Sequence, residues 1–145
     1  MPSTIENLLN LKIWKEDEAK NRFALSLKDL ATEEEILKNY KDKLLEIEDD
    51  FKKYNEGSID LSKIKDVMAH QEYLIRKIAE IKKNILKKEE IVERHRLELV
   101  EATKEKRIFH RLFDKQKEQE LKKQQRLEQI ISDESASVRF TANEE

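Results

Sequence analysis

The stretch KKYNEGSIDLSK at residues 52–63 contains Gly57, the only glycine of the chain. The only proline is Pro2, so nothing else between the two ends interrupts a helix strongly. Glycine commonly follows the last turn of a helix because it adopts the left-handed conformation without steric cost. Ser58 or Asp60 can then serve as the N-cap of a second helix. The stretch therefore predicts one turn, at residues 55–60, between two long helices.

The composition is compatible with such helices. Charged residues make up 43% of the 145 residues, hydrophobic residues 37% and aromatic residues 6%. These proportions are typical of disordered chains or of helices rich in Glu, Lys and Leu, and periodicity distinguishes the two. The net charge of −2 gives no bias towards nucleic acid. No cysteine is present, and no apolar run is long enough for a bilayer span or a signal peptide, so we expect a soluble, cytosolic protein.

Large apolar side chains recur every seven residues on both sides of the turn. Before it they form the series Phe23, Leu30, Leu37, Leu44 and Phe51, and the series Tyr40, Ile47 and Tyr54. After it they form the series Ile78, Ile85, Val92 and Leu99, and the series Val67, Leu74 and Ile81. This a/d pattern is that of a coiled coil. Polar residues interrupt it, among them Lys12, Glu16, Lys88 and His95.

Folding back at the turn brings the two patterns into antiparallel register. Residues whose numbers add to 118, such as Leu44 and Leu74, then face each other, and each pair joins an a position to a d position. We therefore predict an all-α fold, a long two-helix antiparallel coiled-coil hairpin with a longer second helix. As a single domain it comprises a helix at 3–54, begun by a capping box at Ser3 and Glu6, a helix at 61–133 and a frayed tail at 134–145. The alternative is a parallel dimer with a kink at Gly57.

The sequence contains no recognisable catalytic or cofactor motif. A single glycine cannot supply a phosphate-binding loop. His70, His95 and His110 lack metal-ligand spacing, and His95 is expected to be a tolerated polar residue on the apolar seam. A two-helix hairpin also offers no concave pocket. We therefore expect neither enzymatic activity nor a cofactor or metal ion.

Several apolar residues fall outside the seams, at positions that point outward in a two-helix coil. They are Trp14, Leu25, Leu45, Tyr73, Leu86, Leu97, Val100 and Ile108. So many of them suggest surfaces that partners cover, above all at Trp14 and Tyr73. Scatter along an irregular coil is the alternative.

Both ends of the chain resemble the FliJ family of flagellar type III export proteins. The early segment LLNLKIWKEDEAK at 8–20, the segment EATKEKR at 101–107 and the closing SDESASVRF at 132–140 carry the resemblance, together with the hairpin plan. It implies a non-enzymatic stalk, similar to the coiled-coil part of the gamma subunit of rotary ATP synthases, at the cytoplasmic face of the inner membrane.

The resemblance also implies partners. The end that carries both termini would enter the central hole of the hexameric export ATPase, and a surface nearer the turn would contact the cytoplasmic domain of the membrane export gate. Export chaperones would bind as well, and nucleic acid would not. The positions that correspond most nearly to the gate surface are Ile47, Tyr54, His70, Tyr73 and Leu74.

A basic stretch supports the contact with the ATPase. Lys104, Lys106, Arg107, Arg111, Lys115 and Lys117 lie close together in sequence, with only Glu105 and Asp114 among them. We expect no neutralisation from residues 1–14, because Lys12 would fall opposite Lys106. We predict that Lys104, Lys106, Arg107 and Arg111, with Trp14, contact the ATPase ring. Two alternatives remain, an export chaperone or adaptor and a structural spacer without a coupling role.

Overall fold

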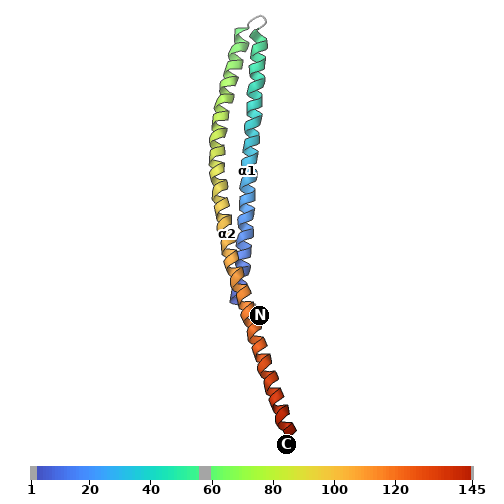
Figure 1. The fold of residues 1–145 in the computed structure, drawn as a ribbon. Helices are drawn as coiled ribbons and strands as arrows, with labels where there is room; N and C mark the ends of the chain where they lie inside the picture. Colours follow the sequence, from blue (N-terminus) through green and yellow to red (C-terminus); the bar gives the residue numbers. More distant parts are fainter. Residues whose placement is uncertain (1–2, 56–59, 145) are drawn as a thin grey trace. The chain divides into compact units, whose positions relative to one another are not determined.

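The computed structural model describes residues 3–55 and 60–144, and these residues form two α-helices (Figure 1). Helix α1 spans Thr4–Asn55 and helix α2 spans Leu61–Glu144. The predicted all-α hairpin is confirmed, and the described residues include no strand. Gly57 and Ser58, on which the predicted turn depends, lie outside the described residues.

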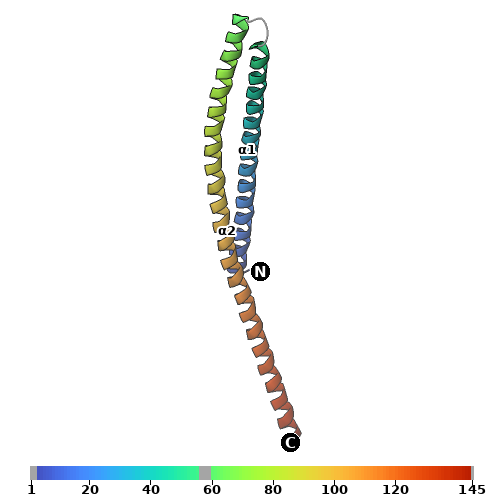
Figure 2. The ribbon, with the colours of Figure 1, turned by 45° about the horizontal axis from the view of Figure 1, so that its top comes forward.

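The chain divides into two compact units. The terminal unit consists of Met1–Asp17 and Glu101–Glu145, and the turn unit consists of Glu18–Val100. In the turn unit the two helices lie side by side and run in opposite directions (Figures 1 and 2). No helix among the described residues is long and apolar enough to cross a membrane.

Both helices begin at a side-chain cap. The Ser3 hydroxyl accepts a hydrogen bond of 3.1 Å from the backbone N–H of Glu6, as the capping-box spacing predicts. At α2 the Asp60 carboxylate accepts a 3.1 Å bond from the N–H of Ser62. Asp60, one of the two candidate N-caps, therefore caps α2. Each such cap stabilises its helix by about 1 kcal/mol.

The predicted end of the second helix is corrected by the structure. Helix α2 continues to Glu144, whereas the sequence predicted an end near Asp133 and a frayed tail. The segment 134–144 contains neither glycine nor proline, so no residue in it interrupts the backbone hydrogen bonds. Every residue of 118–143 is nevertheless exposed, which means that this part of the helix has no packing partner among the described residues.

The turn unit is held together by one continuous seam, in which the shielded residues are three or four positions apart. On α1 they are Ala19, Phe23, Ser26, Leu30, Glu33, Leu37, Tyr40, Leu44, Ile47 and Phe51. On α2 they are Ile64, Val67, Gln71, Leu74, Ile78, Ile81, Ile85, Lys88, Val92, His95 and Leu99. This alternation is the a/d pattern of a coiled coil, and it passes through the polar positions without a break.

The seam of the terminal unit follows the same spacing with more polar members. Ile5, Leu9, Lys12 and Glu16 on α1 and Ala102, Lys106, Phe109, Phe113 and Gln116 on α2 are its shielded residues. The Ser3 hydroxyl also donates a 3.2 Å hydrogen bond to the side-chain oxygen of Gln116. Lys12 and Glu16, which interrupt the apolar pattern in sequence, are thus part of the contact between the helices.

Alanine substitutions at Leu74 and at its neighbour Tyr73 test the packing between the two helices. Leu74 is 1% exposed, whereas Tyr73 is 42% exposed. We expect Leu74→Ala to lower the free energy of unfolding by about 2–5 kcal/mol, because it leaves a cavity between the helices. Tyr73→Ala serves as the control and should change the free energy by no more than about 0.5 kcal/mol. Urea unfolding followed by circular dichroism measures both, and equal effects would contradict this packing.

Candidate functional site

The candidate functional site of this protein is a surface rather than a pocket. The described residues hold no group of three or more His, Cys, Asp or Glu side chains that could bind a metal ion. Hollows along the exposed end of α2 are lined by one face of a single helix, such as Ser137, Val138 and Thr141. The informative features are therefore charged clusters and exposed apolar side chains.

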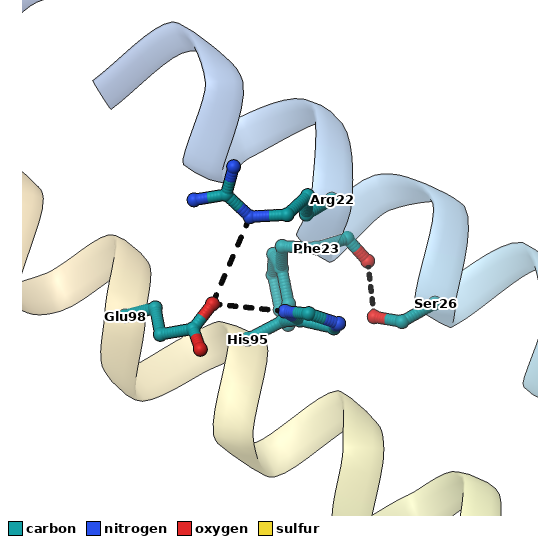
Figure 3. A network of polar contacts seen from close by, with 5 residues as sticks. All are labelled: Arg22, Phe23, Ser26, His95 and Glu98. Atoms are coloured by element: carbon teal, nitrogen blue, oxygen red, sulfur yellow. Dashed lines mark hydrogen bonds and ion pairs between the residues drawn. The ribbon is translucent and has the colours of Figure 1, made fainter. Parts of the chain in front are cut away.

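His95 lies on the seam of the turn unit, within a small polar network (Figure 3). Its Nδ1 is 3.0 Å from Oε2 of Glu98, and the same carboxylate oxygen is 3.7 Å from Nε of Arg22 on α1. The hydrogen bond with His95 lowers the pKa of Glu98, and the positive charges of Arg22 and Arg94 lower it further. His95 therefore has a polar partner at the edge of the seam, in agreement with its expected role as a tolerated core residue.

Ser26 is the second polar member of this network. It is buried, and its hydroxyl donates a 2.7 Å hydrogen bond to the backbone carbonyl oxygen of Phe23 (Figure 3). A serine that bonds within its own helix needs no partner from the other helix. The network of Figure 3 is therefore a structural part of the seam.

An ionic cluster lies on the seam of the terminal unit and consists of Lys12, Glu16, Glu105 and Lys106. Nζ of Lys12 is 2.8 Å from Oε2 of Glu105, and Nζ of Lys106 is 2.9 Å from Oε1 of Glu16. Nζ of Lys12 also lies 5.4 Å from the centre of the Phe109 ring. Glu16 is only 3% exposed, so its charge is held by these partners rather than by water.

We expected no neutralisation of the basic stretch from residues 1–14. The cluster shows that Glu16, just beyond these residues, pairs with Lys106, and that Lys12 pairs with Glu105 of the other helix. Lys106, predicted to contact the ATPase, therefore belongs mainly to the contact between the helices.

Four of the five remaining cations of this stretch form a basic row on the outer face of α2. The fifth is Lys117, whose Nζ lies 4.6 Å from the centre of the Phe113 ring. The row consists of Lys104, Arg107, Arg111 and Lys115, whose spacing of three or four residues places them along one side of the helix. All four are exposed, and none makes an ion pair with another residue that the structure describes. An unpaired row of this kind is free to attract an acidic surface.

Exposed apolar side chains accompany the basic row in the terminal unit. Those of α1 are Leu8, Leu11, Ile13 and Trp14, and those of the adjoining stretch of α2 are Ile108 and Leu112. Trp14 is the most exposed of them, at 59%. The sequence identified Trp14 and Ile108, and it missed the other four because they lie beside the seam. Leu8, Leu11, Ile13 and Trp14 occupy four of the seven positions 8–14. This density of apolar residues was the sequence signal for the three residues that were missed on α1.

The outward positions predicted from the heptad pattern are confirmed in the turn unit as well. Leu25, Leu45, Tyr73, Leu86, Leu97 and Val100 are all exposed. Tyr73 stacks on His70, with ring centres 6.2 Å apart and planes inclined by 10°. The two rings form an exposed aromatic pair on α2.

The other residues of the implied gate surface are placed differently. Leu74 is buried in the seam, so it does not reach a partner while the helices are closed. Ile47 is half-buried on the seam, and the side chain of Tyr54 lies outside the described residues. The structure therefore brings only His70 and Tyr73 together on an open surface.

The exposed end of α2, residues 118–143, carries further apolar side chains. They are Leu121, Leu127, Ile130, Ile131, Val138 and Phe140. Leu127, Ile131 and Val138 are four and seven residues apart, which places them on one face of the helix. This face has no partner among the described residues.

Comparison with known proteins was informative at the level of the family. A family model described as flagellar FliJ protein matches residues 2–145. Neither a search of curated proteins nor a search of solved structures gave a match. The match to the family model extends over nearly the whole chain and confirms the resemblance that the two ends of the sequence indicated.

The pair of Lys12 and Glu105 predicts a measurable pH dependence. The hydrogen bond from Lys12, with the positive charges of Lys12 and Lys15, lowers the pKa of Glu105 below its ordinary value of 4.5. A lowered carboxyl pKa contributes stability above the ordinary value, and that stability is lost as the pH falls through the folded-state pKa. We expect Glu105→Gln to reduce the loss of thermal stability between about pH 5 and pH 3. Glu101→Gln, at an exposed neighbouring position, should retain the wild-type pH dependence, and identical curves for both variants would contradict the pairing.

Proposed function

Because the chain belongs to the FliJ family, and is therefore a component of the flagellar export apparatus, we propose that it is the stalk that couples the export ATPase to the export gate. The terminal unit binds the hexameric ATPase ring, and the turn unit binds the cytoplasmic domain of the gate. The protein performs no catalysis itself. It acts at the cytoplasmic face of the inner membrane, where export chaperones also reach it.

The observation that best supports the ATPase contact is the coincidence of two features in the terminal unit. The basic row on α2 makes no ion pair with a described residue, and Trp14 with its apolar neighbours is exposed on the same unit. A partner that covers both must present acidic and apolar groups together. Binding of this type is fast at low salt and weakens as salt screens the charges over about 8–10 Å.

The basic row provides the sharpest test of the ATPase contact. We expect reversal of Lys104, Arg107, Arg111 and Lys115 to Glu to weaken binding to the cognate ATPase by about tenfold or more at low salt, and to abolish stimulation of ATP hydrolysis. Lys106 is left unchanged, because its loss would uncover the charge of Glu16. Binding is measured by titration at low and high salt, and hydrolysis by phosphate release.

A matched control is available in the turn unit. Lys82, Lys83 and Lys87 are exposed, and reversing them to Glu changes the net charge similarly without touching the terminal unit. The control should bind and stimulate the ATPase as the wild type does. If the basic-row variant retains full binding at low salt, or if both variants lose it equally, the basic row is only a solvated surface.

The aromatic pair of the turn unit supports the gate contact. Aromatic side chains that are exposed before binding often supply much of the energy of an interface. Tyr73→Ala should therefore weaken binding to the cytoplasmic domain of the gate by about tenfold or more while ATPase binding stays unchanged. Leu86→Ala, at another exposed apolar position of α2, is the control. Equal gate affinity of the two variants would place the gate contact elsewhere.

One observation favours an export chaperone or adaptor as a second candidate. The apolar face of Leu127, Ile131 and Val138 has no partner within the described chain, and such a face is suited to holding apolar segments of unfolded substrates. The effect of the protein on ATP hydrolysis distinguishes the stalk from the chaperone. A stalk stimulates ATP hydrolysis in the absence of substrate, whereas a chaperone keeps an export substrate soluble without affecting the ATPase.

A further inference from the structure

The charged residues of the seam are all paired across it. In the turn unit Nζ of Lys88 on α2 is 3.6 Å from Oε2 of Glu33 on α1. In the terminal unit Lys12 pairs with Glu105, and Glu16 pairs with Lys106. Every charged seam position of α1 thus meets an opposite charge of α2, although acidic and basic residues are irregularly placed along both helices.

The apolar residues of the seam do not distinguish the native register from a register shifted by one heptad. Leu30, Leu37 and Leu44 repeat at intervals of one heptad on α1, and Ile78 and Ile85 do so on α2. If one helix slides by a heptad, or about 10 Å, leucine replaces leucine and isoleucine replaces isoleucine. The a/d matching is also unchanged, so the slid arrangement buries a similar apolar surface.

The same slide separates every charge pair. With the register that pairs Leu44 and Leu74, Glu33 lies in the layer of Ile85, next to Lys88. After a slide in one direction Glu33 lies in the layer of Val92, with His95 in the place of Lys88, and after a slide in the other it lies in the layer of Ile78, with Ile81 in that place. The side chain of Glu33 is only 14% exposed. A charge at such a position without its partner is strongly unfavourable.

We propose that five seam charges, those of Lys12, Glu16, Glu33, Lys88 and Lys106, form a register lock that holds each unit of the hairpin in one alignment. The lock selects between packings that the apolar residues do not distinguish, at a cost in total stability relative to an apolar seam. It keeps surface residues of the two helices, for example Trp14 on α1 and the basic row on α2, in fixed positions along the helices. This inference goes beyond the proposed function and does not depend on it.

The test uses the full chain, which contains no cysteine of its own. Three double variants place cysteines at Leu44 and Leu74 for the native register, or at Leu44 with Ile81 or with Val67 for the two slid registers. Each pair is introduced into the wild-type sequence and into a leucine variant that carries Lys12→Leu, Glu16→Leu, Glu33→Leu, Lys88→Leu and Lys106→Leu. Disulfide formation is followed on non-reducing gels, on samples that are monomeric by light scattering.

In the wild-type sequence the native pair should crosslink about tenfold or more faster than either slid pair, because a disulfide requires the two Cα atoms to lie within about 7 Å. In the leucine variant at least one slid pair should rise to within about threefold of the native pair, while the melting temperature increases. The preference for the native register then falls while thermal stability rises, which a purely stabilising role of the charges does not predict.

A charge-swapped variant supplies the matched control. Glu33→Lys together with Lys88→Glu exchanges the two charges of the turn unit and preserves their attraction, so it should crosslink as the wild type does. The lock is refuted if the leucine variant keeps the wild-type preference for the native pair, because the turn and the apolar seam would then set the register. It is equally refuted if the wild type crosslinks in several registers.

Discussion

Each unit of the structure depends on one seam of side chains between its two helices. Among the described residues no second layer covers the seam, so each helix presents one face to the other and the rest to solvent or to partners. Only a few side chains, such as Ala19 and Leu74, are fully enclosed. The stability of a chain arranged in this way is distributed along the contact between its helices rather than concentrated in a thick core.

This thinness explains why the polar residues of the seam matter. In a globular core, a carboxylate such as Glu16 would lie far from water, and its burial would be severely unfavourable. Here the charged groups lie at the edge of a narrow contact, where an ammonium group of the other helix reaches them. The seam therefore admits charges that a thick core would exclude, and it gains specificity of alignment from them.

Much of the fold could be predicted from the sequence, because helix caps and heptads are local patterns. Ser3 as a cap and Leu44 as a seam residue follow from spacing alone.

The role of Glu16 could not be predicted in this way. A single acidic residue interrupts an apolar pattern, and its partner Lys106 is 90 positions away in the sequence. The resemblance implied Leu74 as part of a partner surface without revealing that the α1 helix covers it. The end of α2 was predicted too early, because the last residues of a chain are usually poorly ordered and were expected to be frayed here. The basic stretch of the candidate site was predictable from the sequence, but dividing its cations into paired and unpaired ones required the positions of the side chains.

The segment of α2 from 118 to 143 has a consequence of its own. Its helix is held by backbone hydrogen bonds without tertiary contacts, and short isolated helices in water interconvert rapidly with coil. The paired part of α2 in the terminal unit supplies the first turns, so the costly nucleation step is already complete and unwinding proceeds from the carboxyl end. The helical part of the segment therefore lengthens or shortens from its carboxyl end. Any molecule that covers Leu127, Ile131 and Val138 shifts this helix–coil equilibrium, so the length of ordered helix depends on what is bound to it.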